Sequence, residues 1–227
     1  MPTLKRNQVK VPADVMPESR DEYIENYLKA TQGTGRLMLF ACDQKMEHLN
    51  GDFYGEGIDP SDNDPEHLFQ IGAQGVCGVL AGQRGLIVVL WIYPRGKAVA
   101  DEKDPALIAG AAGAALCLGA DFVKVNPPKA TEGKTSAENL AIASQAAGRT
   151  GLVCAGGSKA SAEDFLSNLY DQIHVGGAVG NATGRNIHMR SLDEAVRLTK
   201  AISAITLADY EVADALAVFN GEKDFTI

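Results

Sequence analysis

The chain has 227 residues, of which 45% are hydrophobic and 22% are charged, and its formal net charge is −8. This length suits one sizeable domain with a real core, and it is slightly short for a full eight-unit α/β barrel of roughly 250 residues. The acidic balance argues against a nucleic-acid partner, because binding to a phosphate backbone needs clustered Lys and Arg side chains.

The amino-terminal half is expected to begin with an extended arm over residues 1–18. A helix then starts at Ser19, where Glu22 is placed to complete a capping box, and it stops near Gly33. The next expected elements are a strand at 37–43, a helix launched by Asp64-Pro65, strands at 76–81 and 85–94, and an Ala-rich helix from Asp104 to about Leu118.

The carboxyl-terminal half repeats this pattern. The expected elements are a strand at 122–126, a helix at 136–147, a strand at 151–155, a helix at 161–170, a strand at 174–179, a helix after a capping box at Ser191 and Glu194, and a last helix at about 207–219. Strands that alternate with helices predict a parallel sheet with helical crossovers, covered on both faces. No linker divides the chain, so we expect one domain over residues 1–227, with an arm and helix at 1–33.

One join in this pattern is too short for a crossover. The expected strands at 76–81 and 85–94 are separated by little more than AGQRG, whereas a parallel crossover with a helix needs a dozen or more residues. The predicted fold class is therefore α/β, of the (β/α)8 TIM-barrel type, but incomplete, with about six strands. Unpaired edges recruit other chains, so we expect an open sheet or closure by another subunit.

Cysteines and histidines show no metal-binding pattern. No cysteine belongs to a C-x-x-C pair, and we expect four buried free thiols in a reducing cytoplasm: Cys42, Cys77, Cys117 and Cys154. The four histidines lack metal-ligand spacing. The amino terminus has no continuous apolar signal region, and no run approaches about 18 apolar residues, so neither secretion nor a membrane span is expected.

Parallel α/β barrels carry their active sites at the carboxyl ends of the strands, and Lys124 is the most informative residue in such a position. It lies within an expected strand, between Val123 and Val125. Burial disfavours the charged form of an amine, so we expect a lowered pKa, and a neutral amine is what a Schiff-base nucleophile requires. The alternative is a lysine that is ion-paired to a carboxylate on a neighbouring strand, for example Asp43.

Trp91, Tyr93 and Arg95 alternate along one expected strand, so period-two geometry points them to one face. An indole, a phenol and a guanidinium together suit a ligand with a hydroxylated carbon chain and an anionic end. A phenol can relay protons, and Arg can grip a phosphate through two hydrogen bonds. The alternative is an aromatic core pair with a snorkelling Arg.

Two glycine-rich loops predict a phosphate-binding site. The first places Gly156, Gly157 and Ser158 between a strand and a helix, and the second contains Gly184 and Arg185. Such loops present bare backbone N–H groups and the positive end of a helix dipole to an anion. Neither loop matches G-x-x-x-x-G-K-[ST], so a nucleoside-triphosphate loop is not expected.

Together these motifs resemble those of the archaeal-type class I fructose-1,6-bisphosphate aldolases, which are relatives of deoxyribose-phosphate aldolase. The matching segments are LWIYPRG (90–96), GADFVKVNPP (119–128), AGGSK (155–159) and TGRNI (183–187), with the strand that ends in Asp43. They occur in the family's order, and the resemblance runs from about residue 20 to the carboxyl terminus.

The resemblance implies a Schiff-base lyase of glycolysis and gluconeogenesis. Such an enzyme cleaves fructose 1,6-bisphosphate to dihydroxyacetone phosphate and glyceraldehyde 3-phosphate, or forms it from them, and it needs no metal or other cofactor. The implied partner is a phosphorylated sugar rather than a nucleic acid or a membrane, and the implied state is a cytoplasmic homo-oligomer.

The resemblance also implies roles for individual residues. Lys124 would form the imine, Tyr93 would move the proton of the C4 hydroxyl, and Asp43 would assist proton transfers during carbinolamine formation. The remaining site residues would contact the substrate: Trp91 lines the pocket, Gly156, Gly157, Ser158, Gly184 and Arg185 hold one phosphate, and Arg95 contacts the other.

The chain departs from the family in two places. Gln44-Lys45 follow Asp43, where many relatives carry His-Gly, and only three strands fit before the lysine strand, which is the family's sixth of eight. Two βα units are therefore expected to be absent, with low or no aldolase activity in the isolated chain. Two alternatives stay open: a related lysine-dependent transaldolase- or thiolase-type lyase, and a non-catalytic shortened relative that keeps a phosphate site.

Overall fold

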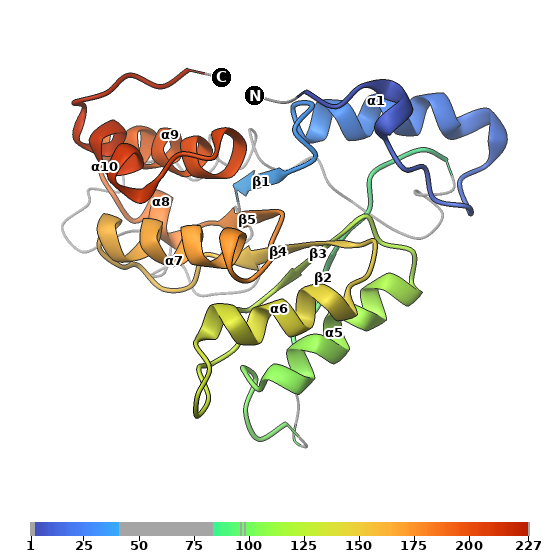
Figure 1. Cartoon of the computed structure of the whole chain (residues 1–227), viewed down its shortest axis with the longest axis horizontal. Coiled ribbons are helices and arrows are strands. Elements are labelled where there is room, and N and C mark those ends of the chain that lie inside the picture. Colours follow the sequence, from blue (N-terminus) through green and yellow to red (C-terminus); the bar gives the residue numbers. More distant parts are fainter. Residues whose placement is uncertain (1–2, 41–83, 96, 98, 227) are drawn as a thin grey trace. The chain divides into compact units, whose positions relative to one another are not determined.

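The computed structural model describes residues 3–40, 84–95, 97 and 99–226 (Figure 1). The expected helix after Asp64-Pro65, the expected strand at 76–81 and the carboxylate of Asp43 all lie outside these residues.

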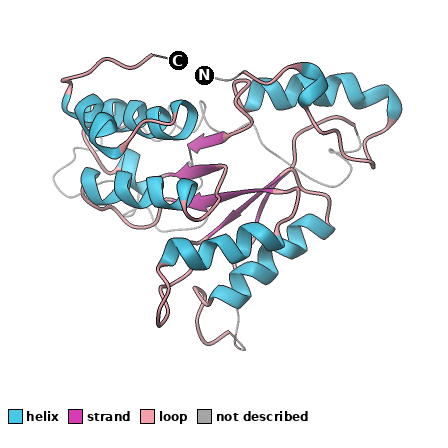
Figure 2. Cartoon of the chain, viewed as in Figure 1, coloured by secondary structure: helices cyan, strands magenta, loops and turns pink. Residues whose placement is uncertain are grey.

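Helices and strands alternate along the described chain, as the sequence predicts (Figure 2). The helices are two short 3-10 turns, Arg6–Gln8 and Pro17–Ser19, and the α-helices α1 (Arg20–Ala30), α5 (Pro105–Cys117), α6 (Ser136–Ala146), α7 (Ala162–His174), α8 (Arg185–His188), α9 (Leu192–Ala208) and α10 (Val212–Asn220). The strands are β1 (Leu37–Phe40), β2 (Val89–Trp91), β3 (Phe122–Val125), β4 (Gly151–Ala155) and β5 (Gly180–Thr183).

The described strands form one sheet in the order β1-β5-β4-β3-β2. β2, β3 and β4 are parallel, and their register sets Lys124 opposite Trp91 on one side and Val153 on the other. The part of the chain that the structure describes thus contains five strands, with β1 and β2 at the two ends of the order. This confirms the predicted incomplete α/β fold.

Contacts divide the chain into two compact units. Unit 1 comprises Met1–Leu37, Gly75–Cys154 and Asp171–Gly180, and unit 2 comprises Met38–Gln74, Ala155–Tyr170 and Asn181–Ile227. The expectation of a single domain over residues 1–227 stays a prediction.

The core of unit 1 lies between β2, β3 and β4 and the helices α5 and α6, which run side by side in Figure 1. Small side chains make this close packing possible, since Ala112 and Ala115 of α5 and Ala143 of α6 are fully buried. The start of α5 is fixed locally as expected, because the Asp104 side chain accepts hydrogen bonds from the N–H groups of Ala106 and Leu107, at 2.9 and 3.2 Å.

In unit 2, α9 supplies much of the buried surface. Ala201, Ile202, Ala204 and Ile205 are all fully buried. The Ser191 hydroxyl caps this helix by accepting a hydrogen bond from the N–H of Glu194 at 3.4 Å. The returning bond from the Glu194 side chain to the Ser191 N–H is not formed, so half of the expected capping box is present. The helix runs on to Ala208, so the expected start of the last helix at 207 is wrong; α10 begins only at Val212.

The expected strand at 174–179 is wrong. α7 continues to His174, Gly177 turns the chain with a φ of +71°, and the strand follows at Gly180–Thr183. The sequence of this strand, GNAT, contains two polar residues that are nevertheless buried. The Asn181 amide donates to the Thr206 hydroxyl, and the Thr183 hydroxyl donates to the Asn181 side-chain oxygen, both at 2.8 Å. A search for apolar runs passes over such a strand.

Three smaller expectations are also corrected. Ser19 belongs to a 3-10 turn with φ −99° and ψ −1°, not to an extended cap, so its side chain makes no capping bond and the box with Glu22 is absent. The expected strand at 85–94 forms only over Val89–Trp91. Of the two described cysteines, both are free, but only Cys154 is buried and Cys117 is exposed at the end of α5.

Candidate active site

Lys124 lies in the middle of β3, with its side chain almost entirely buried (4% exposed). The neighbours Val123 and Val125 are fully buried, as the strand pattern predicts. The Lys124 Nζ atom sits 5.0 Å from the centre of the Trp91 ring on the adjacent strand β2. The indole excludes water from one side of the amine, so the pair forms an amine site with an apolar wall.

Trp91 itself is half-exposed, with 43% of its surface accessible. It is the last residue of β2, so Tyr93 and Arg95 lie in the loop beyond the strand, and the expectation of one alternating strand through all three is wrong. Arg95 and Tyr93 still lie together, because the Arg95 guanidinium sits 5.1 Å from the centre of the Tyr93 ring.

Arg95 also has an acidic partner that the sequence reasoning missed. Its Nε atom lies 3.3 Å from the Glu102 Oε2 atom, and both side chains are about half-exposed. Exposed ion pairs contribute little, typically about 0–1 kcal/mol. A dianionic phosphate could therefore replace Glu102 as the partner of Arg95.

The loops that follow β2 and β3 are tied to each other within unit 1. The Lys129 Nζ atom lies 2.6 Å from the Asp101 carboxylate, and the Lys129 N–H donates to the Lys103 carbonyl at 2.9 Å. The hydrogen bond from Lys129 lowers the pKa of Asp101, and the same bond raises the pKa of Lys129. These contacts order the rim at the carboxyl ends of the two strands that carry Trp91 and Lys124.

The two glycine-rich loops both lie in unit 2. Gly156 follows β4 and is packed against Thr183, such that a Cβ atom at position 156 would lie 3.1 Å from the Thr183 Cα atom. Gly184 and Arg185 form the start of α8. The structure thus packs Gly156 of the first loop against Thr183, the residue before Gly184 of the second, so closely that a larger side chain at position 156 would require its neighbours to shift.

Asn186 is a residue of this region that the sequence reasoning did not single out. Its side chain donates to the carbonyls of Gly156 and Ser158 and accepts from the N–H of Ala160. Its position directly after Gly184-Arg185 was the available signal, since Asn can donate and accept at once.

One expected site residue has no described counterpart. Asp43 lies outside the described residues. Among the described residues, no group of three or more His, Cys, Asp or Glu side chains is placed to hold a metal ion. Within the same part of the chain, no helix is long and apolar enough to cross a membrane.

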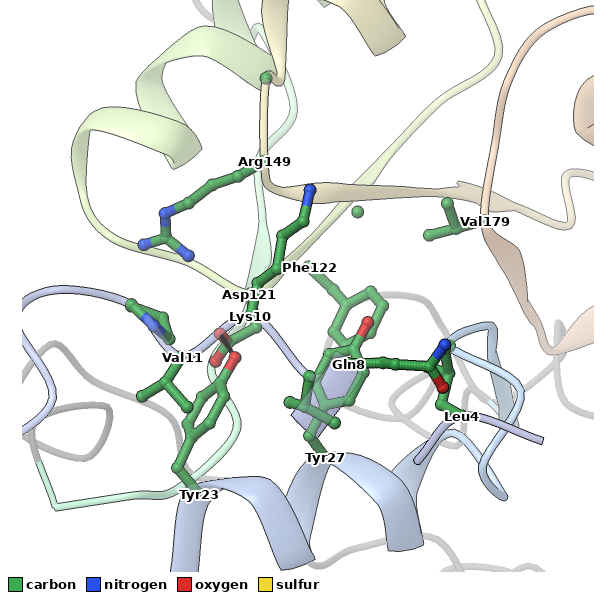
Figure 3. Close-up of a pocket in the computed structure, with 15 residues that line it drawn as sticks. Leu4, Gln8, Lys10, Val11, Tyr23, Tyr27, Asp121, Phe122, Arg149 and Val179 are labelled. Carbon is green, nitrogen blue, oxygen red and sulfur yellow. Dashed lines mark hydrogen bonds between the residues drawn. The ribbon is translucent and has the colours of Figure 1, made fainter. Parts of the chain in front are cut away.

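A separate pocket of about 410 Å³ lies in unit 1, near the amino-terminal ends of β3 and β4 (Figure 3). Its wall includes the stacked rings of Tyr23, Tyr27 and Phe122, with centroids 6.1 and 5.9 Å apart. Active sites of parallel α/β barrels lie at the opposite, carboxyl ends of the strands. We therefore assign this pocket to the packing of the amino-terminal arm and α1, not to chemistry.

A buried hydrogen-bond network fixes this packing. The Tyr23 hydroxyl donates to the Asp121 Oδ1 atom at 2.5 Å, and the Val88 N–H donates to Oδ2 at 2.8 Å. Burial raises the pKa of Tyr23, and the charge of Asp121 raises it further. Burial also raises the pKa of Asp121, against the lowering effect of these two hydrogen bonds.

Tyr23→Phe should destabilise the fold by about 1–3 kcal/mol at pH 7, because it leaves a buried carboxylate oxygen of Asp121 without its donor. The native chain should also lose stability above about pH 10, where an unfolded tyrosine ionises but folded Tyr23 keeps its proton. Tyr23→Phe should make that alkaline loss shallower. Urea unfolding at pH 7 and at pH 10.5 measures both effects. Tyr210→Phe, whose ring packs on Phe225 in unit 2, is the control, and an equal effect of both changes would contradict the assignment.

Comparison with known proteins places these features in a family. Residues 59–190 match the sequence model of the DeoC/LacD family of aldolases. The chain is 40% identical over 304 residues to a fructose-bisphosphate aldolase/6-deoxy-5-ketofructose 1-phosphate synthase of Methanocaldococcus jannaschii, with 97% of each chain covered. That alignment is longer than the 227-residue chain, so the relative has stretches without a counterpart here. This agrees with the internal shortening that the strand spacing predicts.

Solved structures give the same picture. A fructose-bisphosphate aldolase from Slackia heliotrinireducens matches with a TM-score of 0.91 and 57% identity, over 100% of this chain and 98% of that one. An archaeal fructose 1,6-bisphosphate aldolase matches with a TM-score of 0.51 and 23% identity, over 87% of this chain and 88% of that one, which shows the TIM-barrel type of fold alone. The fold of this chain, incomplete as it is in the described residues, is thus shared with a solved relative.

Proposed function

Because the chain belongs to the DeoC/LacD aldolase family, we propose that it is a class I aldolase that cleaves or forms fructose 1,6-bisphosphate through an imine on Lys124. The observation that carries the proposal is the buried amine of Lys124 against the indole of Trp91, 5.0 Å from the ring centre. A strand lysine with so little access to water is uncommon, and it suits a nucleophile that must react as the neutral amine.

The reaction begins when the Lys124 nitrogen attacks the C2 carbonyl of the open-chain sugar. Loss of water from the carbinolamine gives a protonated imine, and Asp43 assists these proton transfers. Tyr93 then takes the proton of the C4 hydroxyl, the C3–C4 bond breaks, and its electron pair moves into the imine to give an enamine. Glyceraldehyde 3-phosphate leaves. Protonation at C3 and hydrolysis then release dihydroxyacetone phosphate and regenerate the amine.

Substrate binding is divided among the remaining site residues. Trp91 lines the apolar wall of the pocket. One phosphate binds to the backbone N–H groups of the two glycine loops, with Gly156, Gly157, Ser158 and Gly184, and to the side chain of Arg185. The other phosphate contacts Arg95, in exchange for its exposed partner Glu102.

Cleavage of fructose 1,6-bisphosphate in the presence of excess chelator tests this function. We expect turnover that the chelator does not reduce, since the protonated imine serves as the electron sink. Activity lost on chelation would contradict the imine mechanism. Binding of the sugar phosphate without any turnover would instead support a shortened relative that keeps only the phosphate site.

A second candidate is the same lysine chemistry on another acceptor aldehyde, a transaldolase-like reaction. The Methanocaldococcus jannaschii relative supports this candidate, because it is named both as an aldolase and as a synthase of another ketose phosphate. Incubation with fructose 1,6-bisphosphate and a second aldehyde separates the two candidates, because transfer gives a new ketose phosphate without releasing dihydroxyacetone phosphate, whereas cleavage releases it.

The setting we propose is the cytoplasm, where such a reaction serves glycolysis and gluconeogenesis. The free thiols of Cys117 and Cys154 fit a reducing compartment.

We further propose a homo-oligomer. Exposed large apolar side chains of unit 1, including Leu86 and Leu118, support an interface, since such side chains tend to be covered.

A further inference from the structure

The buried side chain of Asn186 connects the two glycine loops of unit 2. Its Nδ2 atom donates to the carbonyl oxygens of Gly156 at 2.8 Å and Ser158 at 3.0 Å, and its Oδ1 atom accepts from the N–H of Ala160 at 2.9 Å. Asn186 is 0% exposed, so these protein groups take the place of water. One carboxamide thus holds the segment Gly156–Ala160, which we call the first glycine loop, at both ends.

Arg190 reinforces the same arrangement. Its Nε atom donates to the Asn186 carbonyl at 2.8 Å, and one terminal nitrogen donates to the Ala160 carbonyl at 2.6 Å. Its guanidinium also lies 5.9 Å from the centre of the Phe219 ring of α10. Burial lowers the pKa of Arg190, which means that holding this charge at the base of the loop costs free energy. Arg190 therefore holds the backbone of Asn186 as well.

The first glycine loop has open hydrogen-bond donors on its exposed side. No group among the described residues accepts a hydrogen bond from the N–H of Gly157, Ser158 or Lys159, all of which are exposed. Gly157 adopts a φ of +71°, in the left-handed region. Successive N–H groups around a left-handed residue make a concave site for an anion.

The bonds of Asn186 determine where two of these donors point. In a planar trans peptide, the carbonyl and the N–H point in opposite directions. Because Asn186 binds the carbonyls of Gly156 and Ser158, the N–H groups of Gly157 and Lys159 must point away from Asn186. The carboxamide therefore orients the donors without reaching the anion itself.

We propose that Asn186 is a positioning residue for the phosphate site. It holds the first glycine loop in the conformation in which the N–H groups of Gly157 and Lys159 are presented to a phosphate, and it couples that loop to Arg185, the residue before it in the chain. The inference rests on the proposed function in one respect, since it takes the phosphate of a sugar as the anion.

Asn186→Asp tests the proposal with a side chain of the same shape. The two donated bonds are lost, and at neutral pH a carboxylate faces two carbonyl oxygens. Hydrogen bonds to charged groups matter enough that the Kd for inorganic phosphate and for dihydroxyacetone phosphate should rise on the order of 10- to 100-fold. For the aldolase reaction, the KM for the bisphosphate should rise similarly, while kcat changes less than about threefold.

The pH profile separates positioning from simple structural damage. A buried carboxylate is disfavoured, so the introduced Asp takes up a proton as the pH falls toward 5 and regains one donor. The affinity of Asn186→Asp, compared with that of the native chain at the same pH, should therefore recover in part. A variant that is merely damaged would show no such recovery.

Two matched controls complete the design. Asn26→Asp makes the same change in unit 1, where the Asn26 Nδ2 atom donates to the Gly85 carbonyl at 2.9 Å, and it should leave the phosphate Kd unchanged. Gly157→Ala disturbs the loop without touching Asn186, since a Cβ there meets no atom within 4 Å and only the positive φ is strained. It should also weaken phosphate binding. Gly221→Ala, with φ +79° and equal space at the end of α10, should not.

The outcomes are distinct. Unchanged phosphate affinity in folded Asn186→Asp overturns the inference, and if that variant does not fold, unchanged affinity in Gly157→Ala overturns it. A native chain that binds no phosphate overturns it as well. If the native chain binds phosphate but does not cleave the bisphosphate, the aldolase function fails, while a loss of affinity in Asn186→Asp still upholds the positioning role.

Discussion

Borohydride added together with dihydroxyacetone phosphate should attach one covalent adduct to the chain, on the peptide that contains FVKVNPP. Reduction traps the imine that we propose for Lys124, whose amine is buried against Trp91. Intact-protein mass and peptide mapping measure the adduct. It needs only the first half of the reaction, so it should form even if cleavage by the isolated chain is slow.

Lys124→Met should remove both the adduct and turnover, with a loss on the order of 10⁴-fold or more in kcat, as expected when a covalent nucleophile is deleted. The fold should stay largely intact, because methionine is a side chain of similar length that fills the same site. Lys200→Met, on the exposed side of α9, is the control and should keep the adduct. An adduct on a different lysine, in protein that is active, would refute the assignment.

Tyr93→Phe should lower kcat for cleavage of the bisphosphate about 10²- to 10⁴-fold while KM changes little. The phenol is lost as proton acceptor for the C4 hydroxyl, but the ring stays beneath the Arg95 guanidinium, 5.1 Å away, so the binding contacts are retained. Steady-state kinetics measure the two constants separately.

The same variant should still form the reduced adduct with dihydroxyacetone phosphate, because imine formation on Lys124 does not need the C4 proton transfer. This split distinguishes a proton relay from a packing role. Tyr170→Phe, which loses the exposed hydrogen bond to Glu211 in unit 2, is the control. Near-normal turnover in Tyr93→Phe would mean that Tyr93 contributes packing, which was the alternative open from the sequence.

The level of aldolase activity tests whether the shortened chain still works as an enzyme. We expect low aldolase turnover for the isolated chain, because two βα units are inferred to be absent, and that expectation stays a prediction. A solved aldolase with 57% identity, matched over 98% of its length, shares this fold. Turnover of the two proteins should therefore be compared.

The sequence alone determined the features that short-range rules encode. Asp104 caps α5, Ser191 caps α9, and Lys124 lies in a strand between two buried valines. Each of these features depends mainly on neighbours within four residues. The sequence also shows the order of the motifs and the short connection before residue 86, and together these predicted an incomplete barrel.

Only the tertiary structure decided the features that depend on distant partners. The strand at Gly180–Thr183 contains polar residues but is buried, because the Asn181 amide donates a hydrogen bond to the hydroxyl of Thr206, 25 residues away. The Asn186 side chain likewise donates to the Gly156 carbonyl, 30 residues away. Burying a polar group is favourable only when its hydrogen bonds are met, and those partners are set by packing, not by sequence spacing.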